Sequence, residues 1–206
     1  MTKQKPTSGY LKTVLGVAVI CATLVSCTDR SVQWRTDNID GLVPDLAFDM
    51  TDDSGRSVSA QTYRGKTALL FFGYTNCPDV CPTTLATLAR ALEATKTHDV
   101  DTVVLFVTVD PDRDTLKRMH DYVHAFGQWF VGLRGTPDEL QTLTKRYRVS
   151  YSYGKPDKAG NYEVTHSTAV FVFDRKGRSR LLIRPGDTTT AITADLNQLA
   201  ALQSGN

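Results

Sequence analysis

Two almost continuous runs of hydrophobic residues dominate the central part of the chain. Residues 67–73 and 102–109 have the length and composition of strands that are buried on both faces. Between them, leucines and alanines recur at helical spacing over residues 82–96, so this segment is predicted to form a helix with one apolar side. A strand, a helix and a second strand in this order predict a parallel βαβ unit.

Shorter hydrophobic segments before and after this unit complete the predicted fold. In chain order we expect a hairpin (46–51 and 56–59), the βαβ unit, a helix from an N-cap at Asp114 to about Ala125, a strand (129–133), a helix opened by Thr136 and Pro137, an inserted hairpin (148–153 and 162–164), a second hairpin (169–173 and 179–183) and a final helix (188–202). Parallel units followed by an antiparallel hairpin and a helix are typical of a thioredoxin-like fold. We therefore expect an α/β domain whose central mixed sheet is flanked by helices, with an N-terminal hairpin and an inserted hairpin.

The first part of the chain has the organisation of an export signal. Lysines precede an apolar stretch over residues 13–25, which is shorter than the roughly 18 residues expected of a transmembrane helix. The stretch ends in Leu-Val-Ser before Cys27, which resembles the lipobox of bacterial lipoproteins, where the signal is removed and the cysteine is acylated. We predict a lipoprotein signal peptide at 1–26, a lipid-anchored tether at 27–40 and a folded domain at 41–206. An ordinary signal peptide or an uncleaved anchor is the alternative.

Composition and charge narrow the possible functions. The chain is 41% hydrophobic and 22% charged, as expected of a globular protein. Its 24 basic and 22 acidic residues give a net charge of +2, which is too small a bias to indicate nucleic-acid binding. No Gly-x-Gly-x-x-Gly motif or P-loop is present for a nucleotide. Four cysteines are too few for a disulfide scaffold. If the signal peptide is removed and Cys27 is acylated, Cys77 and Cys81 are the remaining thiols, and export places them in an oxidising compartment.

Cys77 and Cys81 lie four residues apart in the loop between the first buried strand and its helix. The exposed N–H groups of a helix N-terminus stabilise a thiolate, and at this spacing both sulfurs can point to the same side. The pair could therefore close a redox-active disulfide or bind one soft metal ion. The alternative is a purely structural role, as two buried cysteines or as a static disulfide. The position of the pair at a strand-to-helix turn disfavours this alternative.

His166 comes just before the strand predicted at 169–173. In a thioredoxin-like fold the loop that enters this strand faces the cysteine loop, and disulfide exchangers usually have a cis-proline there. Here the nearest upstream proline is Pro156. A histidine at this place would complete a set of two thiols and one imidazole, which suits copper in either oxidation state and also zinc. A histidine hydrogen-bonded at the edge of the core is the alternative.

Three separated segments resemble motifs of the Sco/SenC family. They are residues 73–85 around the two cysteines, residues 109–115, and Thr165-His166-Ser167. The resemblance extends over about residues 40–202. It implies a thioredoxin-like fold on the outer face of a membrane and copper, as Cu(I) and Cu(II), bound by Cys77, Cys81 and His166. It also implies that this copper is delivered to the binuclear copper centre of a respiratory oxidase, or is used with thiol chemistry to prepare that centre.

We therefore predict a copper metallochaperone that is lipid-anchored in a bacterial cell envelope and faces the periplasm. Its partner would be the apo copper-centre subunit of a cytochrome c oxidase, with a copper donor protein and a thiol reductant as further partners. Such a protein turns over no substrate, so it is not strictly an enzyme. The alternative is a thiol–disulfide oxidoreductase in which Cys77 and Cys81 reduce the copper-ligand cysteines of the oxidase. A peroxidase is disfavoured, because the Pro-x-x-x-Thr-x-x-Cys loop of peroxiredoxins does not match the residues before Cys77.

Three further residues have both a functional and a purely structural interpretation, namely Asp110, His120 and His124. Asp110 ends the second buried strand, so its carboxylate could support the metal ligands, dock a partner or simply cap a turn. His120 and His124 are four residues apart on a predicted helix, a spacing that can bind a divalent metal. Because no third ligand is evident in the pattern, a polar helix face is favoured for this pair. Met119 beside them is expected in the core.

Overall fold

The computed structural model describes residues 1–2, 32–95 and 102–204 and divides the chain into two units, Met1–Gln33 and Trp34–Asn206. All helices and strands of the described residues belong to the second unit. Residues 3–31, which include most of the predicted signal peptide and Cys27, lie outside the described residues, so these assignments stay predictions. Within the described ranges, no helix is long and apolar enough to cross a membrane.

Eight strands of the described residues form one mixed sheet, in the order β1-β10-β9-β4-β5-β6-β2-β3. They are β1 (Asp37–Asn38), β2 (Asp49–Asp52), β3 (Ser57–Ser59), β4 (Thr67–Gly73), β5 (Thr102–Thr108), β6 (Phe130–Arg134), β9 (Val170–Phe173) and β10 (Ser179–Ile183). Strands β4, β5 and β6 run parallel, whereas β9 pairs antiparallel with β4. The inserted hairpin is also present, as a separate sheet of β7 (Tyr151–Tyr153) and β8 (Val164–His166).

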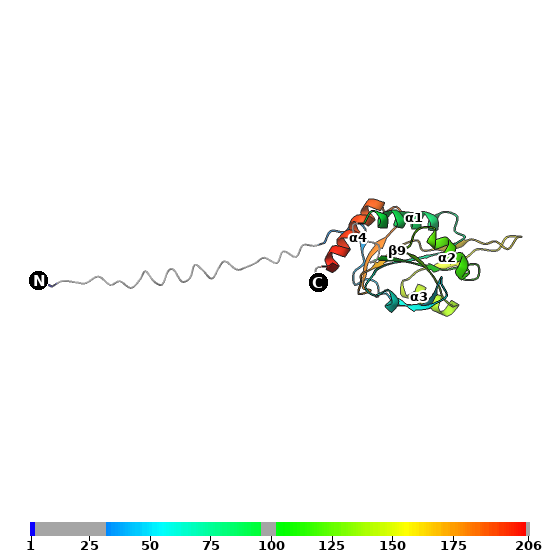
Figure 1. The fold of residues 1–206 in the computed structure, drawn as a ribbon, viewed down its shortest axis with the longest axis horizontal. Helices are drawn as coiled ribbons and strands as arrows, with labels where there is room; N and C mark the ends of the chain where they lie inside the picture. The colour runs from blue at the N-terminus through cyan, green and yellow to red at the C-terminus, as the bar shows by residue number, and fades with distance from the viewer. Residues whose placement is uncertain (3–31, 96–101, 205–206) are drawn as a thin grey trace. The chain divides into compact units, whose positions relative to one another are not determined.

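Helices cover both faces of the main sheet. Among the described residues these are α1 (Val80–Glu93), α2 (Leu116–His124), α3 (Pro137–Arg146) and α4 (Thr189–Ser204), with a short 3-10 helix at Ala60–Tyr63. Helices α1 and α4 pack on each other on one side of the sheet, and α3 lies on the other side (Figure 1). Because the central strand β4 is covered from both sides, all seven of its residues are buried. The predicted α/β, thioredoxin-like fold is confirmed.

The start of α2 differs from the sequence prediction. Thr115, not Asp114, is the N-cap, and its hydroxyl accepts a hydrogen bond from the N–H of Arg118. Asp114 is completely buried one residue earlier. Both residue types are good N-caps, so the sequence could not tell which of two neighbours takes that role.

The folded unit also begins earlier than predicted, at Trp34 instead of residue 41. Strand β1 adds to the edge of the sheet by pairing antiparallel with β10. Just before it, the buried carboxylate of Asp195 in α4 accepts the backbone N–H groups of Arg35 and Thr36 at 2.8–3.1 Å. A polar two-residue strand has no periodicity to recognise, so the sequence assigned this segment to the tether.

Candidate metal centre

The cysteine loop leaves the sheet at Gly73, the last residue of β4, and ends where α1 begins at Val80. Cys81 is therefore in the first turn of α1 and is completely buried, whereas Cys77 precedes the helix and is half-buried. The backbone N–H of Cys81 points at the sulfur of Cys77, 3.4 Å away. Both cysteines are free thiols. The predicted placement at a strand-to-helix turn is confirmed.

Asp114 holds this loop against the end of β5. Its carboxylate accepts hydrogen bonds from the N–H of Thr75 at 3.1 Å and from the Thr75 hydroxyl at 2.5 Å. The hydroxyl of Thr108 donates to the same carboxylate at 2.6 Å. Hydrogen bonds to a buried carboxylate are among the stronger ones in proteins. Asp114 is thus a residue of the site's framework that the sequence analysis assigned to a helix cap.

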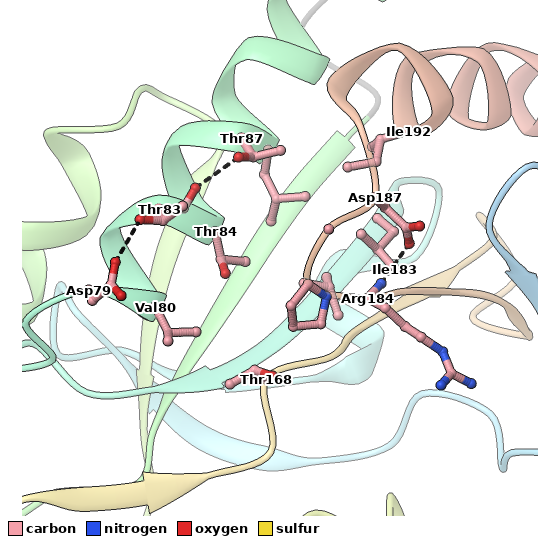
Figure 2. A pocket seen from close by; sticks show the side chains of 14 residues that line it. Asp79, Val80, Thr83, Thr84, Thr87, Thr168, Ile183, Arg184, Asp187 and Ile192 are labelled. Atoms are coloured by element: carbon pink, nitrogen blue, oxygen red, sulfur yellow. Dashed lines mark hydrogen bonds between the residues drawn. The ribbon is translucent and has the colours of Figure 1, made fainter.

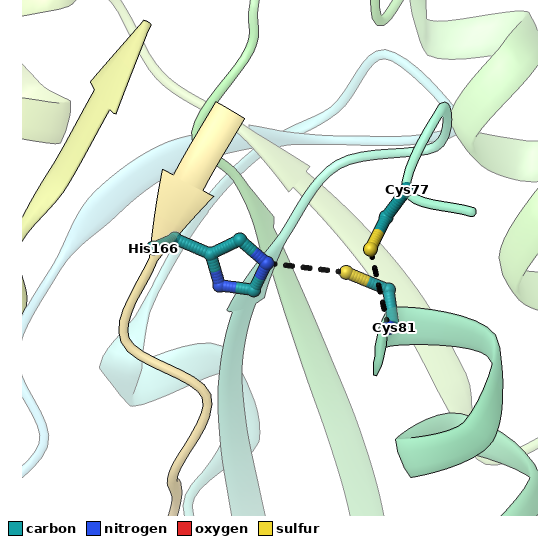
Figure 3. Close-up of side chains that lie close together, drawn as sticks. All are labelled: Cys77, Cys81 and His166. Atoms are coloured by element: carbon teal, nitrogen blue, oxygen red, sulfur yellow. Dashed lines mark hydrogen bonds between the residues drawn. The ribbon is translucent and has the colours of Figure 1, made fainter. Parts of the chain in front are cut away.

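His166 is the last residue of β8, which pairs with β7, and its ring reaches the cysteines from the opposite side (Figure 3). Its Nε2 lies 3.4 Å from the sulfur of Cys81. Its Nδ1 lies 2.9 Å from the carbonyl oxygen of Ser167. Since a carbonyl can only accept, Nδ1 carries the proton, and the lone pair of Nε2 faces Cys81. Histidines that bind metals are commonly oriented in this way, through the other ring nitrogen.

Aromatic rings and burial set the electrostatics of the cluster. The rings of Phe71 and Tyr74 meet the His166 ring edge-on, at centroid distances of 6.2 and 5.9 Å. Burial lowers the pKa of His166, although the hydrogen bond to Ser167 opposes that effect. Burial raises the pKa of the Cys81 thiol. Both pKa shifts favour the neutral forms of His166 and Cys81. The metal-free site therefore carries little buried charge until a metal displaces the thiol protons.

The donor set fits a soft metal ion. One ligand atom from each of Cys77, Cys81 and His166 lies within 4.8 Å of the other two. Thiolates select Cu(I) and imidazole suits copper and zinc, so this donor set fits copper. The structure thus brings together the three residues that the sequence analysis singled out.

Asp110 contacts residues outside this cluster. It is completely buried, and its carboxylate accepts from the Nε–H of Arg113 at 2.5 Å and from the hydroxyl of Tyr162 at 2.7 Å. The Arg113 guanidinium stacks on the Tyr162 ring at 3.6 Å and lies 5.8 Å from the centroid of the Tyr74 ring. A residue without exposed surface does not dock a partner directly. Asp110 instead positions Arg113 and Tyr162 near the aromatic ring that contacts His166.

A shallow cavity of about 190 Å³ borders the cysteine loop (Figure 2). Asp79 and Val80, which lie between the two cysteines in the sequence, form one end of it. Threonines of α1 line one wall, and Thr168 with residues 183–187 lines the opposite wall. The cavity therefore lies between α1 and the end of the C-terminal hairpin, next to the cysteine loop. No sequence pattern predicted it, because its walls come from three separate segments.

A second cluster lies outside this centre. His120 and His124 of α2 face Asp53, which is in the turn between β2 and β3. From the sequence, a polar helix face was favoured for the two histidines because no third ligand was evident, and in the structure the Asp53 carboxylate lies next to them. Asp53 went unnoticed because turn residues such as Asp and Ser are common in hairpins and carry no metal signal by themselves. Met119 is completely buried, as expected.

A thioredoxin-like domain with two thiols and an imidazole gathered at its strand-to-helix turn defines a class of protein with metal or redox chemistry. The SCO1/SenC family model matches residues 41–201. The chain is 37% identical, over 126 residues, to the mitochondrial SCO1 homolog 1 of Arabidopsis thaliana, a match that covers 61% of this chain and 37% of that protein.

Two solved structures are also similar. Copper-bound ScoI of Arabidopsis thaliana has a TM-score of 0.71 and 30% identity, covering 77% of this chain and 98% of that one. Copper-bound ScoI of Bradyrhizobium japonicum has a TM-score of 0.68 and 35% identity, covering 75% of this chain and 98% of that one. The chain belongs to the SCO1/SenC family. It spans less than two thirds of the length of the first curated relatives that it matches. Proteins of this family take part in the copper assembly of cytochrome oxidase.

Proposed function

We propose that this chain is a membrane-anchored copper metallochaperone that supplies the binuclear copper centre of a respiratory cytochrome c oxidase. The observation that carries the proposal is the convergence of Cys77, Cys81 and His166, whose ligand atoms lie within 4.8 Å of one another. Two thiolates bind Cu(I) well, and the imidazole makes Cu(II) acceptable. The related structures with copper bound support the choice of metal.

The unequal burial of the three ligands suits transfer of the ion by ligand exchange. Cys81 is completely buried and His166 is held by Ser167, whereas Cys77 is the more exposed thiol. A donor atom of the incoming apo-subunit would replace Cys77 first, while Cys81 and His166 retain the copper. Further donors of the partner would then displace these two. Copper is the cargo of this process, and no substrate is converted.

A thiol–disulfide oxidoreductase is the second candidate. The observation that favours it is the N–H of Cys81, which points at the Cys77 sulfur and would stabilise a thiolate there. The Cys77 thiolate would attack one sulfur of a partner disulfide, forming a mixed disulfide and releasing the other sulfur as a thiolate. Deprotonated Cys81 would then attack Cys77, which releases the second partner thiolate and leaves a Cys77–Cys81 disulfide. The partner gains two electrons, and a thiol reductant restores the pair.

Copper binding separates these two functions. We would titrate the reduced full-length chain with Cu(II) without oxygen and follow thiolate-to-copper charge-transfer absorption. The chaperone proposal predicts one tight equivalent with such a band. It also predicts that His166→Ala abolishes copper binding and oxidase assembly but leaves disulfide exchange intact. If His166→Ala is silent in cells while Cys77→Ser and Cys81→Ser are not, redox chemistry is the function.

The membrane anchor belongs to the same proposal and rests on the N-terminal sequence. Acylation of Cys27 would hold the domain at a membrane of the bacterial cell envelope, facing the periplasm. In cells fed radiolabelled palmitate, the chain should incorporate label and sediment with membranes. Cys27→Ser should abolish the label without changing the copper band. A labelled Cys27→Ser chain would contradict the anchor.

A further inference from the structure

The second cluster has the geometry of a ligand set for a divalent metal ion. Its members are Asp53, in the β2–β3 turn, and His120 and His124, one turn apart on α2. The Oδ2 atom of Asp53 lies 3.3 Å from Nε2 of His124 and 3.5 Å from Nδ1 of His120. One ligand atom from each residue lies within 4.8 Å of the others. In a tetrahedral site with metal–nitrogen distances near 2.1 Å, neighbouring ligand atoms are about 3.4 Å apart.

The burial of Asp53 gives an independent reason to expect a ligand. Its side chain is only 5% exposed, and its Oδ2 is buried without a hydrogen-bond partner among the described residues. A carboxylate oxygen that is buried and unsatisfied is costly, and such atoms are rare in folded proteins. This oxygen points at the two histidines, whose side chains are 51% and 41% exposed. A cation between these three groups would satisfy the oxygen.

Gly132 of β6 has no side chain and so leaves room for this arrangement. A Cβ on Gly132 would lie 3.0 Å from the terminal methyl of Met119 and 3.2 Å from the Cβ of Asp53. The N–H of Asp53 donates to the carbonyl of Gly132 at 2.9 Å. The glycine therefore lets the β2–β3 turn and α2 approach closely over the same point of the sheet. Strand β6 holds Asp53 in place, and helix α2, which packs on β6, holds the two histidines.

We propose that Asp53, His120 and His124 form a second metal site, which takes a divalent ion of the Zn²⁺ or Cu²⁺ type. Two imidazoles and one carboxylate, without a thiolate, suit borderline divalent ions and not Cu(I). The exposure of both histidines leaves the remaining coordination positions open to water or to a donor from another molecule. The site goes beyond the proposed copper delivery, because it uses none of the residues of the first cluster.

The test uses a full-length, untagged chain in which Cys77→Ser, Cys81→Ser and His166→Ala remove the first cluster. We expect Zn²⁺ to bind this variant with one equivalent, measured by calorimetry. We expect Co²⁺ to give ligand-field bands without thiolate charge transfer. Adding His124→Ala should weaken Zn²⁺ binding at least about tenfold, and His120→Ala should do the same. Failure of copper delivery by the first cluster would leave this result unchanged, so the two proposals fail separately.

A matched control is available on the same helix. Asp121, which pairs with Lys117 at 2.5 Å on the exposed face, also offers a carboxylate close to the histidines in the sequence. Asp121→Asn should leave Zn²⁺ binding unchanged. Both histidines are exposed, so their alanine variants should fold, which near-ultraviolet circular dichroism would verify. The proposal is overturned if the variant without the first cluster binds no Zn²⁺ at micromolar concentration. Equal affinity with and without His120 and His124 would also overturn it.

Discussion

The thiol cluster and the carboxylate cluster are built in the same way but present different chemistry. Each needs a strand glycine beside it: a Cβ on Gly73 would lie 3.0 Å from the sulfur of Cys81, and one on Gly132 would lie 3.2 Å from the Cβ of Asp53. Each also receives a ligand from a segment far away in the sequence. The thiol cluster, however, has soft sulfur ligands and is largely buried, whereas the carboxylate cluster buries its Asp53 side chain and exposes its imidazoles.

This difference indicates what each site can do with an ion. One buried and one half-buried sulfur can hold copper and release it to a competing thiol. Exposed imidazoles around a fixed carboxylate can hold a borderline divalent ion and leave coordination positions open. The two sites are linked through α2, because the guanidinium of Arg118 donates to the side-chain oxygen of Asn76 in the cysteine loop. Variants of each site test whether the two are chemically independent.

The largest expected effect is on copper binding by the thiol cluster. Cys81→Ser replaces a buried thiol with a hard hydroxyl, which does not bind Cu(I). We expect the Cu(I) affinity to fall by more than about a hundredfold, as measured by competition with a chromophoric Cu(I) chelator. His120→Ala is the control and should keep the original affinity. If Cys81→Ser binds Cu(I) within threefold of the unchanged chain, Cys81 is not a ligand.

The two glycines give a direct comparison of packing. In Gly73→Ala the new methyl would lie 2.7 Å from a ring carbon of Phe106, which cannot move far inside the core. We expect a loss of about 2–3 kcal/mol in the free energy of unfolding and weaker copper binding. In Gly132→Ala the nearest atom is the flexible end of Met119, so we expect a smaller loss, of about 1–2 kcal/mol.

Urea unfolding and metal titration of both glycine variants would check this prediction. Gly73→Ala should disturb only the thiol cluster, and Gly132→Ala only Zn²⁺ binding at Asp53. Loss of copper binding in Gly132→Ala would show that the two sites are coupled through the sheet or through α2.

Asp114→Asn tests the framework of the cysteine loop. Both carboxylate oxygens of Asp114 accept hydrogen bonds from Thr75 and Thr108. An asparagine amide has only one acceptor oxygen, so it cannot accept all of them. We expect about 2 kcal/mol of destabilisation in urea, together with weaker copper binding, because the loop loses part of its anchor. Asp112→Asn, an exposed neighbour, should have little effect. An Asp114→Asn chain as stable as the original would mean that the three hydrogen bonds do not hold the loop.

The smallest effect concerns the turn that carries Asp53. Burial would raise the pKa of Asp52, but the Ser54 hydroxyl and the N–H and guanidinium groups of Arg56 outweigh it, so the pKa of Asp52 is lowered. A lowered pKa contributes stability above the unfolded-state value of about 3.9, and this is lost as the pH falls through the folded-state pKa. Asp52→Asn should cost about 1–1.5 kcal/mol at pH 7. The difference in the free energy of unfolding between Asp52→Asn and the unchanged chain should disappear as the pH falls toward about 2.

A matched turn exists in the β9–β10 hairpin, where Asp174 pairs with Arg178 at the same spacing. Burial again opposes the hydrogen bonds from Arg178, which lower the pKa of Asp174. Asp174→Asn should therefore show the same pH trend in urea unfolding. It should leave Zn²⁺ binding unchanged, whereas Asp52→Asn should weaken it. If both variants bind Zn²⁺ equally well, the turn that contains Asp52 does not influence the second site.

Strands and helices with strong patterns were predictable from the sequence. Strand β4 has the predicted bounds, and α3 begins after Thr136, whose hydroxyl and the Glu139 side chain form a capping box. These segments have local causes, namely burial on both faces or a cap within one turn. Strand β1 and the N-cap of α2 were not predicted correctly, because a two-residue pairing and a choice between adjacent caps depend on distant partners.

The sequence by itself determined the thioredoxin-like order of elements and the candidate ligands Cys77, Cys81 and His166, since hydrophobic periodicity and motif spacing are properties of the chain. Only the tertiary structure decided that Asp110 is buried beneath Arg113 and Tyr162, and that Asp114 anchors the cysteine loop. It alone brought Asp53 to the histidines of α2. The physical reason is that a side chain's neighbours across a sheet are set by strand order and register, which local sequence does not encode.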